Sequence, residues 1–223
     1  MLVARRADRL KEIQTELSKK TKVIVCELDI TDSQAVDKFV ASQSEWLTHI
    51  DVLINNAGLA LGREPFQDSK IEDAEAMLAT NILALLRFTH KVLPNMIKKK
   101  SGHILNMGSI AGKTAYQSGT VYCATKAAVH MITEALRIDL GGTGVRVSTV
   151  APGRVAETEF SVVRFKGDED KARQVYEGYR TMSSKDVAEA IAWILDRPSN
   201  VNIQELVIMP TDQPSATMLA PVR

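Results

Sequence analysis

The sequence predicts an α/β fold, with a parallel sheet that carries helices on both faces. Short runs rich in β-branched residues alternate with amphipathic stretches from one end of the chain to the other. Strands that alternate with helices in this way pair in parallel and are covered on both sides. The 223 residues are sufficient for a single domain, 1–223, and do not require a second one.

Each expected strand contains valine or isoleucine, which favour extended backbone. In chain order the expected strands cover residues 2–4, 22–28, 51–56, 103–107, 145–151 and 205–209. The two longest helices are expected over 70–98 and 120–140. The tail after Pro210 contains two further prolines, so we expect it to cross the surface without regular structure.

Local signals predict where several helices begin and end. The pairs Thr31/Gln34, Ser69/Glu72 and Ser183/Asp186 have the spacing of a capping box or its aspartate variant. Gly102 and the pair Gly141–Gly142 lie where helices are expected to end. Three consecutive lysines, 98–100, are interpreted as a helix end where cations offset the helix dipole.

The composition excludes several kinds of partner and site. A net charge of +1 gives no electrostatic basis for binding nucleic acid or an anionic membrane. Cys26 and Cys123 are the only cysteines and no Cys/His spacing suits a metal, so we expect no metal site and a reducing, cytoplasmic environment. No apolar run is long enough to span a bilayer and no secretory signal is visible, so we expect no membrane association.

Tyr122 and Lys126 are four residues apart and therefore share one face of a helix. A free tyrosine has a pKa near 10. A nearby ammonium lowers that pKa and lets the phenol exchange a proton with an alcohol or carbonyl. The spacing alone is common, and a solvated helix face is the alternative interpretation. The small residues Ala124, Ala127 and Ala128 favour close packing around the pair.

Ser109 follows the expected strand 103–107 and precedes Tyr122 by thirteen residues. Ligands of parallel α/β sheets bind at the carboxyl ends of the strands. A hydroxyl group at that position can bond a substrate oxygen and hold it against the tyrosine. Considered alone, Ser109 could equally belong to an ordinary turn.

Three further motifs give these residues a context: "NNAG" at 55–58, "TN" at 80–81 and "VAPGRV" at 150–155. With Ser109, Tyr122 and Lys126, they make the chain resemble the short-chain dehydrogenase/reductase family over essentially its whole length. The resemblance implies a Rossmann-like doubly wound parallel sheet, a nicotinamide cofactor and an oxidoreductase that acts on CH–OH groups.

The resemblance implies four catalytic residues: Asn81, Ser109, Tyr122 and Lys126. Tyr122 would be the general acid/base, and Ser109 would orient the substrate oxygen, so both would bind substrate. Lys126 would lower the pKa of Tyr122 and bind the nicotinamide ribose, while Asn81 would hold a water molecule in the proton relay.

The resemblance also implies the cofactor, because the family's second strand ends beside the adenosine ribose. An acidic residue there suits a free 2′-hydroxyl, whereas arginine suits a 2′-phosphate. Arg5 and Arg6 occupy this position with no acid before Asp8, which implies NADP(H). The cofactor contacts implied in total are Arg5, Arg6, Asp29, Ile30, Asn56, Tyr122, Lys126, Pro152, Gly153, Val155 and Thr158.

The stretches "NNAGLALGREPF" and "PGRVAETEFSVVRFKGD" resemble a narrower branch, the NADP-dependent 3-hydroxy acid dehydrogenases. That branch oxidises serine or L-allo-threonine and reduces malonic semialdehyde. Arg154 and Arg164 are candidates for binding the substrate carboxylate, although either could be surface charge. A carbonyl or 3-oxoacyl reductase of the same family remains an alternative, as does a catalytically inactive partner in mixed oligomers.

One motif of the family is absent from these 223 residues: the first strand with its turn Thr-Gly-x-x-x-Gly-x-Gly and the helix that follows. The glycines at 141–144 occur in the wrong order, after a helix and before a strand. We therefore expect strands 2–4 and 22–28 to be separated from the other four, with exposed apolar edges and weak or absent activity. Helices 70–98 and 120–140 are the expected surfaces for a homodimer or homotetramer.

Overall fold

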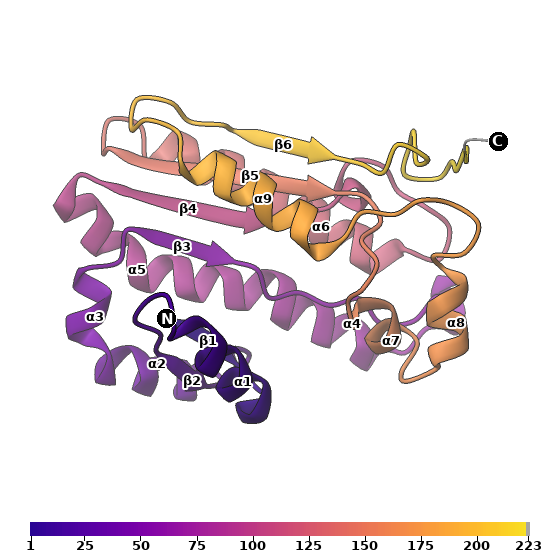
Figure 1. Cartoon of the computed structure of the whole chain (residues 1–223), viewed down its shortest axis with the longest axis horizontal. Coiled ribbons are helices and arrows are strands. Elements are labelled where there is room, and N and C mark those ends of the chain that lie inside the picture. Colours follow the sequence, from indigo (N-terminus) through magenta and orange to yellow (C-terminus); the bar gives the residue numbers. More distant parts are fainter. Residues whose placement is uncertain (222–223) are drawn as a thin grey trace. The chain divides into compact units, whose positions relative to one another are not determined.

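The strands of the computed structural model form two separate parallel sheets (Figure 1). The structure describes residues 1–221. The two sheets belong to two compact units, Met1–His49 and the chain from Ile50 onward. The α/β class and the separation of the first two strands from the other four are confirmed.

In the first unit, β1 (Leu2–Ala4) pairs in parallel with β2 (Val25–Glu27). Helix α1 (Ala7–Leu17) connects the two strands. Helices α2 (Ser33–Ser42) and α3 (Ser44–Thr48) complete the unit. The expected cap at Thr31 is wrong. Asp32 caps α2 instead, because its carboxylate accepts hydrogen bonds from the backbone N–H groups of Gln34 and Ala35.

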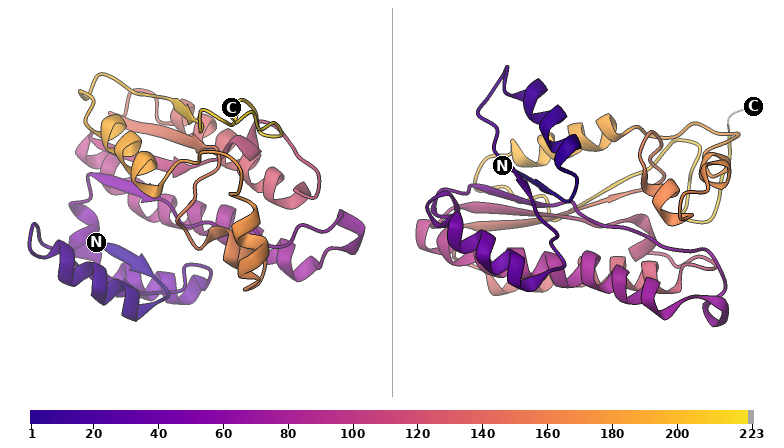
Figure 2. Two further views of the ribbon diagram at one scale, coloured as in Figure 1. Left: turned by 45° about the vertical axis from the view of Figure 1, so that its right-hand side comes forward. Right: turned by 90° about the horizontal axis from the view of Figure 1, so that it is seen from below.

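In the second unit the strands lie in the order β3 (Val52–Asn55), β4 (Gly102–Met107), β5 (Val145–Pro152) and β6 (Glu205–Ile208). Helices α5 (Leu85–Lys99) and α6 (Thr120–Asp139) cover one face of this sheet, and α9 (Ser184–Leu195) covers the other (Figure 2). Val187 and Ile194 of α9 pack on Leu105 and Val150 of the central strands. Burying such side chains contributes about 1.5–3 kcal/mol each to folding.

The expected helix 70–98 is a continuous helix that contains a π-helical segment in its first half. It consists of α4 (Ile71–Leu78), a π-helical segment η2 (Ala79–Ala84), and α5. The expected cap at Ser69 is wrong, because its hydroxyl donates to the carbonyl of Phe66 and Lys70 occupies the N-cap. Gly102 does not end the helix. Lys100, with φ of 54°, is the C-cap of α5, and Gly102 begins β4.

The capping box at Ser183 and Asp186 is confirmed at the start of α9. Short helices complete the second unit: η1 (Phe66–Asp68), η3 (Ile110–Gly112), α7 (Phe160–Arg164) and α8 (Glu169–Gln174). The described tail after Pro210 has no helix or strand, as expected, but its start does not lie on the surface. Asp212 and Gln213 are buried, and Asp212 pairs with Arg180 at 2.6 Å.

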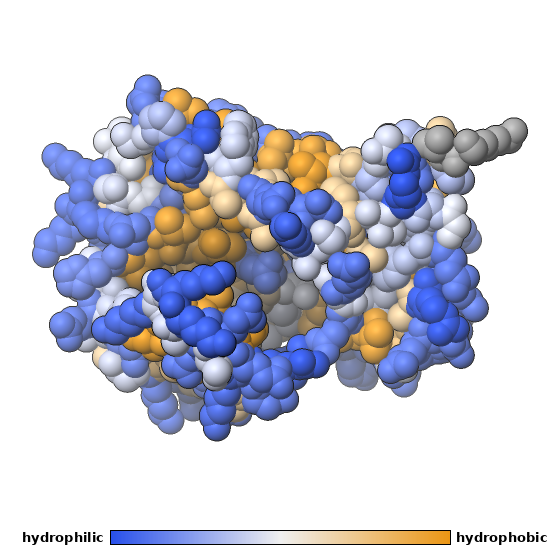
Figure 3. Space-filling view, viewed as in Figure 1, coloured by the Kyte–Doolittle hydropathy of each residue, from blue (hydrophilic) through white to orange (hydrophobic). Residues whose placement is uncertain are grey.

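Within the described part of the chain, strand β3 has a partner strand on one side only, and it exposes two of its apolar side chains. Val52 is 40% exposed and Ile54 is 43% exposed, as expected for an uncovered strand edge. In one view of the surface, apolar patches interrupt a mostly polar covering (Figure 3). Among the described residues, no helix has both the length and the apolar character needed to cross a membrane.

His103 links the stability of the second unit to pH. It is buried in β4, where Nε2 lies 2.7 Å from Ser148 Oγ and Nδ1 has no hydrogen-bond partner among residues 1–221. Burial, assisted by Arg146, lowers the pKa of His103 from 6.5 to about 4. The unfolded chain therefore binds a proton before the folded chain does. Stability should fall as the pH drops from 6.5 to 4, by about 3 kcal/mol in total.

Urea unfolding of the His103→Gln variant at pH 7 and pH 4.5 measures this effect. The variant should lose clearly less stability between the two pH values than the wild type does. His49→Gln, at an exposed position, is the matched control and should keep the wild-type pH dependence. An equal loss for His103→Gln and wild type would remove His103 as the cause.

Candidate active site

A cleft of about 720 Å³ opens beside the carboxyl ends of β4 and β5. It gathers most of the site residues expected within the second unit. Those that line it are Asn56, Ser109, Tyr122, Lys126, Pro152, Gly153, Val155 and Thr158, and the candidate arginines 154 and 164 line it too. Asn81 lies next to this lining, since a Cβ built on Gly58 would be 3.3 Å from Asn81 Oδ1 and 3.4 Å from Lys126 Nζ.

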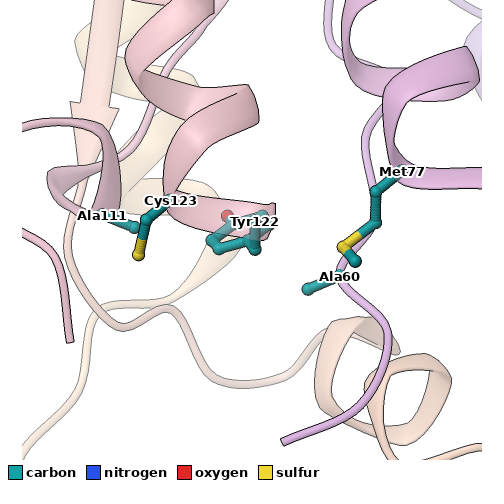
Figure 4. Packing of buried hydrophobic residues seen from close by; sticks show 5 residues of the cluster. All are labelled: Ala60, Met77, Ala111, Tyr122 and Cys123. Atoms are coloured by element: carbon teal, nitrogen blue, oxygen red, sulfur yellow. The ribbon is translucent and has the colours of Figure 1, made fainter. Parts of the chain in front are cut away.

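Tyr122 lies in the first turns of α6 within an apolar cluster (Figure 4). Ala111 and Cys123 lie on one side of it, and Ala60 and Met77 lie on the other. Burial raises the pKa of Tyr122, although the Ser109 side chain and the Arg164 guanidinium both oppose the rise. The expected lowering is therefore not seen in this structure, because loss of hydration outweighs the neighbouring groups.

Lys126 is buried one helical turn beyond Tyr122, and its ammonium nitrogen lies 6.0 Å from the centre of the tyrosine ring. The ammonium donates to the carbonyl of Met107 at 2.7 Å, which fixes it at the end of β4. Burial lowers the pKa of Lys126 to about 8. At neutral pH the side chain is mostly charged, and it can donate further hydrogen bonds into the cleft.

Ser109 lies in the turn between β4 and η3, and its hydroxyl accepts a hydrogen bond from the Ala111 N–H at 3.1 Å. His130 contacts this turn, with its Nε2 at 3.1 Å from the carbonyl oxygen of Ser109. The other ring nitrogen of His130 lies 2.7 Å from Glu205 Oε1, and Lys113 Nζ lies 2.7 Å from Glu205 Oε2. Burial opposes ionisation of Glu205, but its contacts with Lys113 and His130 hold its pKa below the ordinary value.

His130 is a residue of this site that was not among those expected from the sequence. A signal was present, because His130 follows Lys126 by four residues and so lies on the same face of the helix as Tyr122 and Lys126. The turn also depends on glycine. A Cβ at Gly108 would lie 2.8 Å from His130 Nε2, closer than packing allows.

Asn81 lies in the π-helical segment η2, a backbone form that is often found at functional sites. Its carboxamide accepts from the Leu59 N–H at 2.9 Å and donates to the Leu59 carbonyl at 2.9 Å and to Thr125 Oγ1 at 3.0 Å. Asn81 thus ties the loop after β3 to α6. Its role in holding a water molecule stays a prediction.

Basic and aromatic side chains line another part of the cleft. Arg164 is buried, donates to the Gly62 carbonyl and the Tyr116 hydroxyl, and lies over the rings of Tyr116 and Tyr122. Arg154 donates through Nη1 to the Val175 carbonyl and the Tyr179 hydroxyl. The cleft is therefore suited to an anionic ligand. Among the described residues, no group of three or more His, Cys, Asp or Glu side chains could hold a metal.

Four of the expected cofactor-binding residues belong to the first unit: Arg5, Arg6, Asp29 and Ile30. Arg5 follows β1 directly, and Arg6 is the N-cap of α1. The Asp29 carboxylate accepts hydrogen bonds from the N–H and hydroxyl of Thr31. Together with the charge of Arg5, these bonds hold the pKa of Asp29 below its ordinary value.

Comparison with known proteins assigns this arrangement of residues to a family. Residues 1–169 match the family model described as short chain dehydrogenase. The chain is 45% identical, over 94% of its length and 84% of the relative's, to NADP-dependent 3-hydroxy acid dehydrogenase YdfG of Escherichia coli O6:H1. It is 44% identical to the NADP-dependent 3-hydroxy acid dehydrogenase of Schizosaccharomyces pombe, over 97% of its length and 84% of the relative's.

The fold is similar to two solved structures of serine dehydrogenase. One is the closed form of serine dehydrogenase complexed with NADP+, with a TM-score of 0.91 and 43% identity over 99% of this chain and 88% of that one. Another is serine dehydrogenase from Escherichia coli, with a TM-score of 0.80 and 39% identity over 95% of this chain and 86% of that one.

Proposed function

The chain belongs to the short chain dehydrogenase family, and from this membership we propose that it transfers hydride between NADP(H) and a small 3-hydroxy acid or its carbonyl counterpart. Serine, L-allo-threonine and malonic semialdehyde are examples of the proposed substrate class. One observation carries the proposal: the Arg164 guanidinium carbon lies 5.7 Å from the centre of the Tyr122 ring. A group that can transfer a proton therefore lies beside a group that can bind a carboxylate.

The four proposed catalytic residues have separate tasks. Tyr122 exchanges a proton with the substrate oxygen, and Ser109 hydrogen-bonds the same oxygen and fixes its position. Lys126 contributes positive charge and binds the nicotinamide ribose, while Asn81 holds the loop after β3 in place and positions a water molecule for proton transfer. When bound, NADP(H) supplies or takes the hydride.

The residues of the cleft fit a dinucleotide. Gly58 leaves open the space beside Lys126 Nζ that a Cβ would fill, so a ribose can approach the ammonium. Pro152, Gly153, Val155 and Thr158 would hold the nicotinamide end, and Asn56 would lie beside the adenosine. In the first unit, Asp29 and Ile30 would contact the adenine, and Arg5 and Arg6 would bind the 2′-phosphate.

We also propose that the enzyme is a cytoplasmic homodimer or homotetramer that associates through residues 71–99 and α6. These helices expose apolar side chains, including Leu83 at 47%, Met131 at 65% and Ile138 at 72%. Two free cysteines agree with a reducing compartment. A monomer in analytical ultracentrifugation would contradict the assembly.

Titration calorimetry with NADPH, and with NADH as the control, tests the function first. We expect NADPH to bind at least tenfold more tightly than NADH, since two arginines face one extra phosphate. Turnover of 3-hydroxy acids with NADP+ should accompany that binding but be weak, because the glycine-rich turn that would hold the pyrophosphate is absent from residues 1–223. Failure to bind either cofactor would overturn the proposal and favour the alternative of an inactive oligomer partner.

A further inference from the structure

Arg63 is a cationic side chain of the cleft that the proposed chemistry does not use. It follows β3 in the loop that leads to η1, and it lines the same cleft as Tyr122. In the part of the chain that the structure describes, no hydrogen bond or ion pair uses its guanidinium. The carboxylate of its neighbour Glu64 accepts from the Arg63 backbone N–H and, among the described contacts, makes no ion pair with the guanidinium.

Tyr116 brings Arg63 close to the proposed carboxylate-binding group. The guanidinium carbon of Arg63 lies 5.6 Å from the centre of the Tyr116 ring, and that of Arg164 lies 5.5 Å from the same centre. Burial is the main cause that lowers the pKa of Arg63, and repulsion from the charge of Arg164 lowers it further. The two guanidinium groups therefore act on each other within one cleft, and an anion between them would relieve that repulsion.

The lining as a whole is one-sided in charge. Four cations line the described cleft, Arg63, Lys126, Arg154 and Arg164, and no aspartate or glutamate of the described chain does so. Lys126 is held at the end of β4, and Arg154 is held by Val175 and Tyr179. Arg164 already uses two donors on Gly62 and Tyr116, whereas all five N–H donors of Arg63 are available for a ligand.

We propose that Arg63 binds a second acidic group of the substrate, so that the cleft prefers a 3-hydroxy acid with two carboxylates to one with a single carboxylate. This inference rests on the proposed function and refines its substrate class. Arg164 takes the carboxylate near Tyr122, and Arg63 takes the carboxylate at the other end of a short carbon chain. Planar guanidinium groups are suited to this task because they bind carboxylates in a two-point fork.

Binding of unreactive acids tests the inference without requiring turnover. Calorimetry should show that glutarate binds the wild-type chain about tenfold more tightly than butyrate, as expected for one added charge-assisted contact. The Arg63→Met variant should lose that preference. Arg63→Lys, which keeps the charge but not the fork, should retain part of it. Arg173→Met removes an arginine outside the cleft lining and should retain all of it.

A kinetic comparison uses matched substrates with NADP+ as the acceptor: 3-hydroxyglutarate, its monoamide and 3-hydroxybutyrate. We expect kcat/KM to be highest for the diacid, and Arg63→Met to lower that value about tenfold while leaving 3-hydroxybutyrate unaffected. Equal losses for all three acids, or an equal loss of NADPH affinity, would overturn the inference and assign Arg63 to the cofactor or to the fold.

The inference and the proposed function fail in different ways. Turnover of 3-hydroxybutyrate with no preference for diacids would overturn the role of Arg63 and leave the proposed function in place. Conversely, a glutarate preference that Arg63→Met abolishes would support the role of Arg63 even if the chain showed no turnover, and the missing turnover would count against the proposed function.

Discussion

Replacing Tyr122 with phenylalanine is expected to lower kcat about a thousandfold, because it removes the only hydroxyl proposed to exchange a proton with the substrate. The ring should keep its place among Ala60, Met77, Ala111 and Cys123, and its contact with Phe160 at 5.7 Å does not involve the hydroxyl. The dissociation constant for NADPH should therefore change by less than about threefold, since the Tyr122 hydroxyl is only one of the eleven implied cofactor contacts.

Steady-state kinetics and calorimetry on the same preparation separate these two effects. A thermal melt close to that of the wild type serves as the control for folding. Normal turnover by Tyr122→Phe would contradict the assignment of Tyr122 as acid/base. A parallel loss of NADPH binding would show instead that the hydroxyl holds the cofactor.

The double variant Arg5→Ala with Arg6→Ala is expected to weaken NADPH binding about a hundredfold, at roughly 1.4 kcal/mol for each lost charge-assisted contact. The NADH affinity should change little, because NADH lacks the 2′-phosphate. Arg5 directly follows β1 and Arg6 is the N-cap of α1, so both are held by the start of the first unit's helix.

Arg9→Ala is the matched control for these two substitutions. Arg9 lies one turn further along α1 and pairs with Glu12 at 3.2 Å, so its loss removes the same charge from an exposed helix face. It should leave the ratio of NADPH to NADH affinity unchanged. Equal losses for both cofactors in the double variant would refute the 2′-phosphate role.

Regular elements and combined motifs could be predicted from the sequence because they depend on local order. All six strands occur within three residues of the expected bounds, and Ser183 with Asp186 forms the expected capping box. The caps at Thr31 and Ser69 are wrong for a local reason too. In each case a competing hydrogen bond to a nearby group, Asp29 or the Phe66 carbonyl, was available and was formed.

Features that arise from tertiary contact could not be predicted. The Tyr122 and Lys126 spacing shows that they share a helix face, but the pKa of Tyr122 depends on burial by segments distant in sequence. In the same way, Arg63 and Arg164 are about a hundred residues apart, and only the fold brings them to the ring of Tyr116. Arg63 has no local pattern that distinguishes it from surface charge.

The π-helical segment at Ala79–Ala84 has a consequence for how this helix tolerates changes in length. A π turn is an α-helix with one residue more than regular winding requires. Loss of a single residue there would restore regular winding and leave the turns on either side facing much as they do now, because the wide turn already absorbs the extra residue. Met77 would stay beside Tyr122 and α5 would stay on the sheet. Asn81 lies within the segment and would lose the position from which it bonds Leu59 and Thr125. The helix would survive such a deletion, but the tie between the loop after β3 and α6 would not.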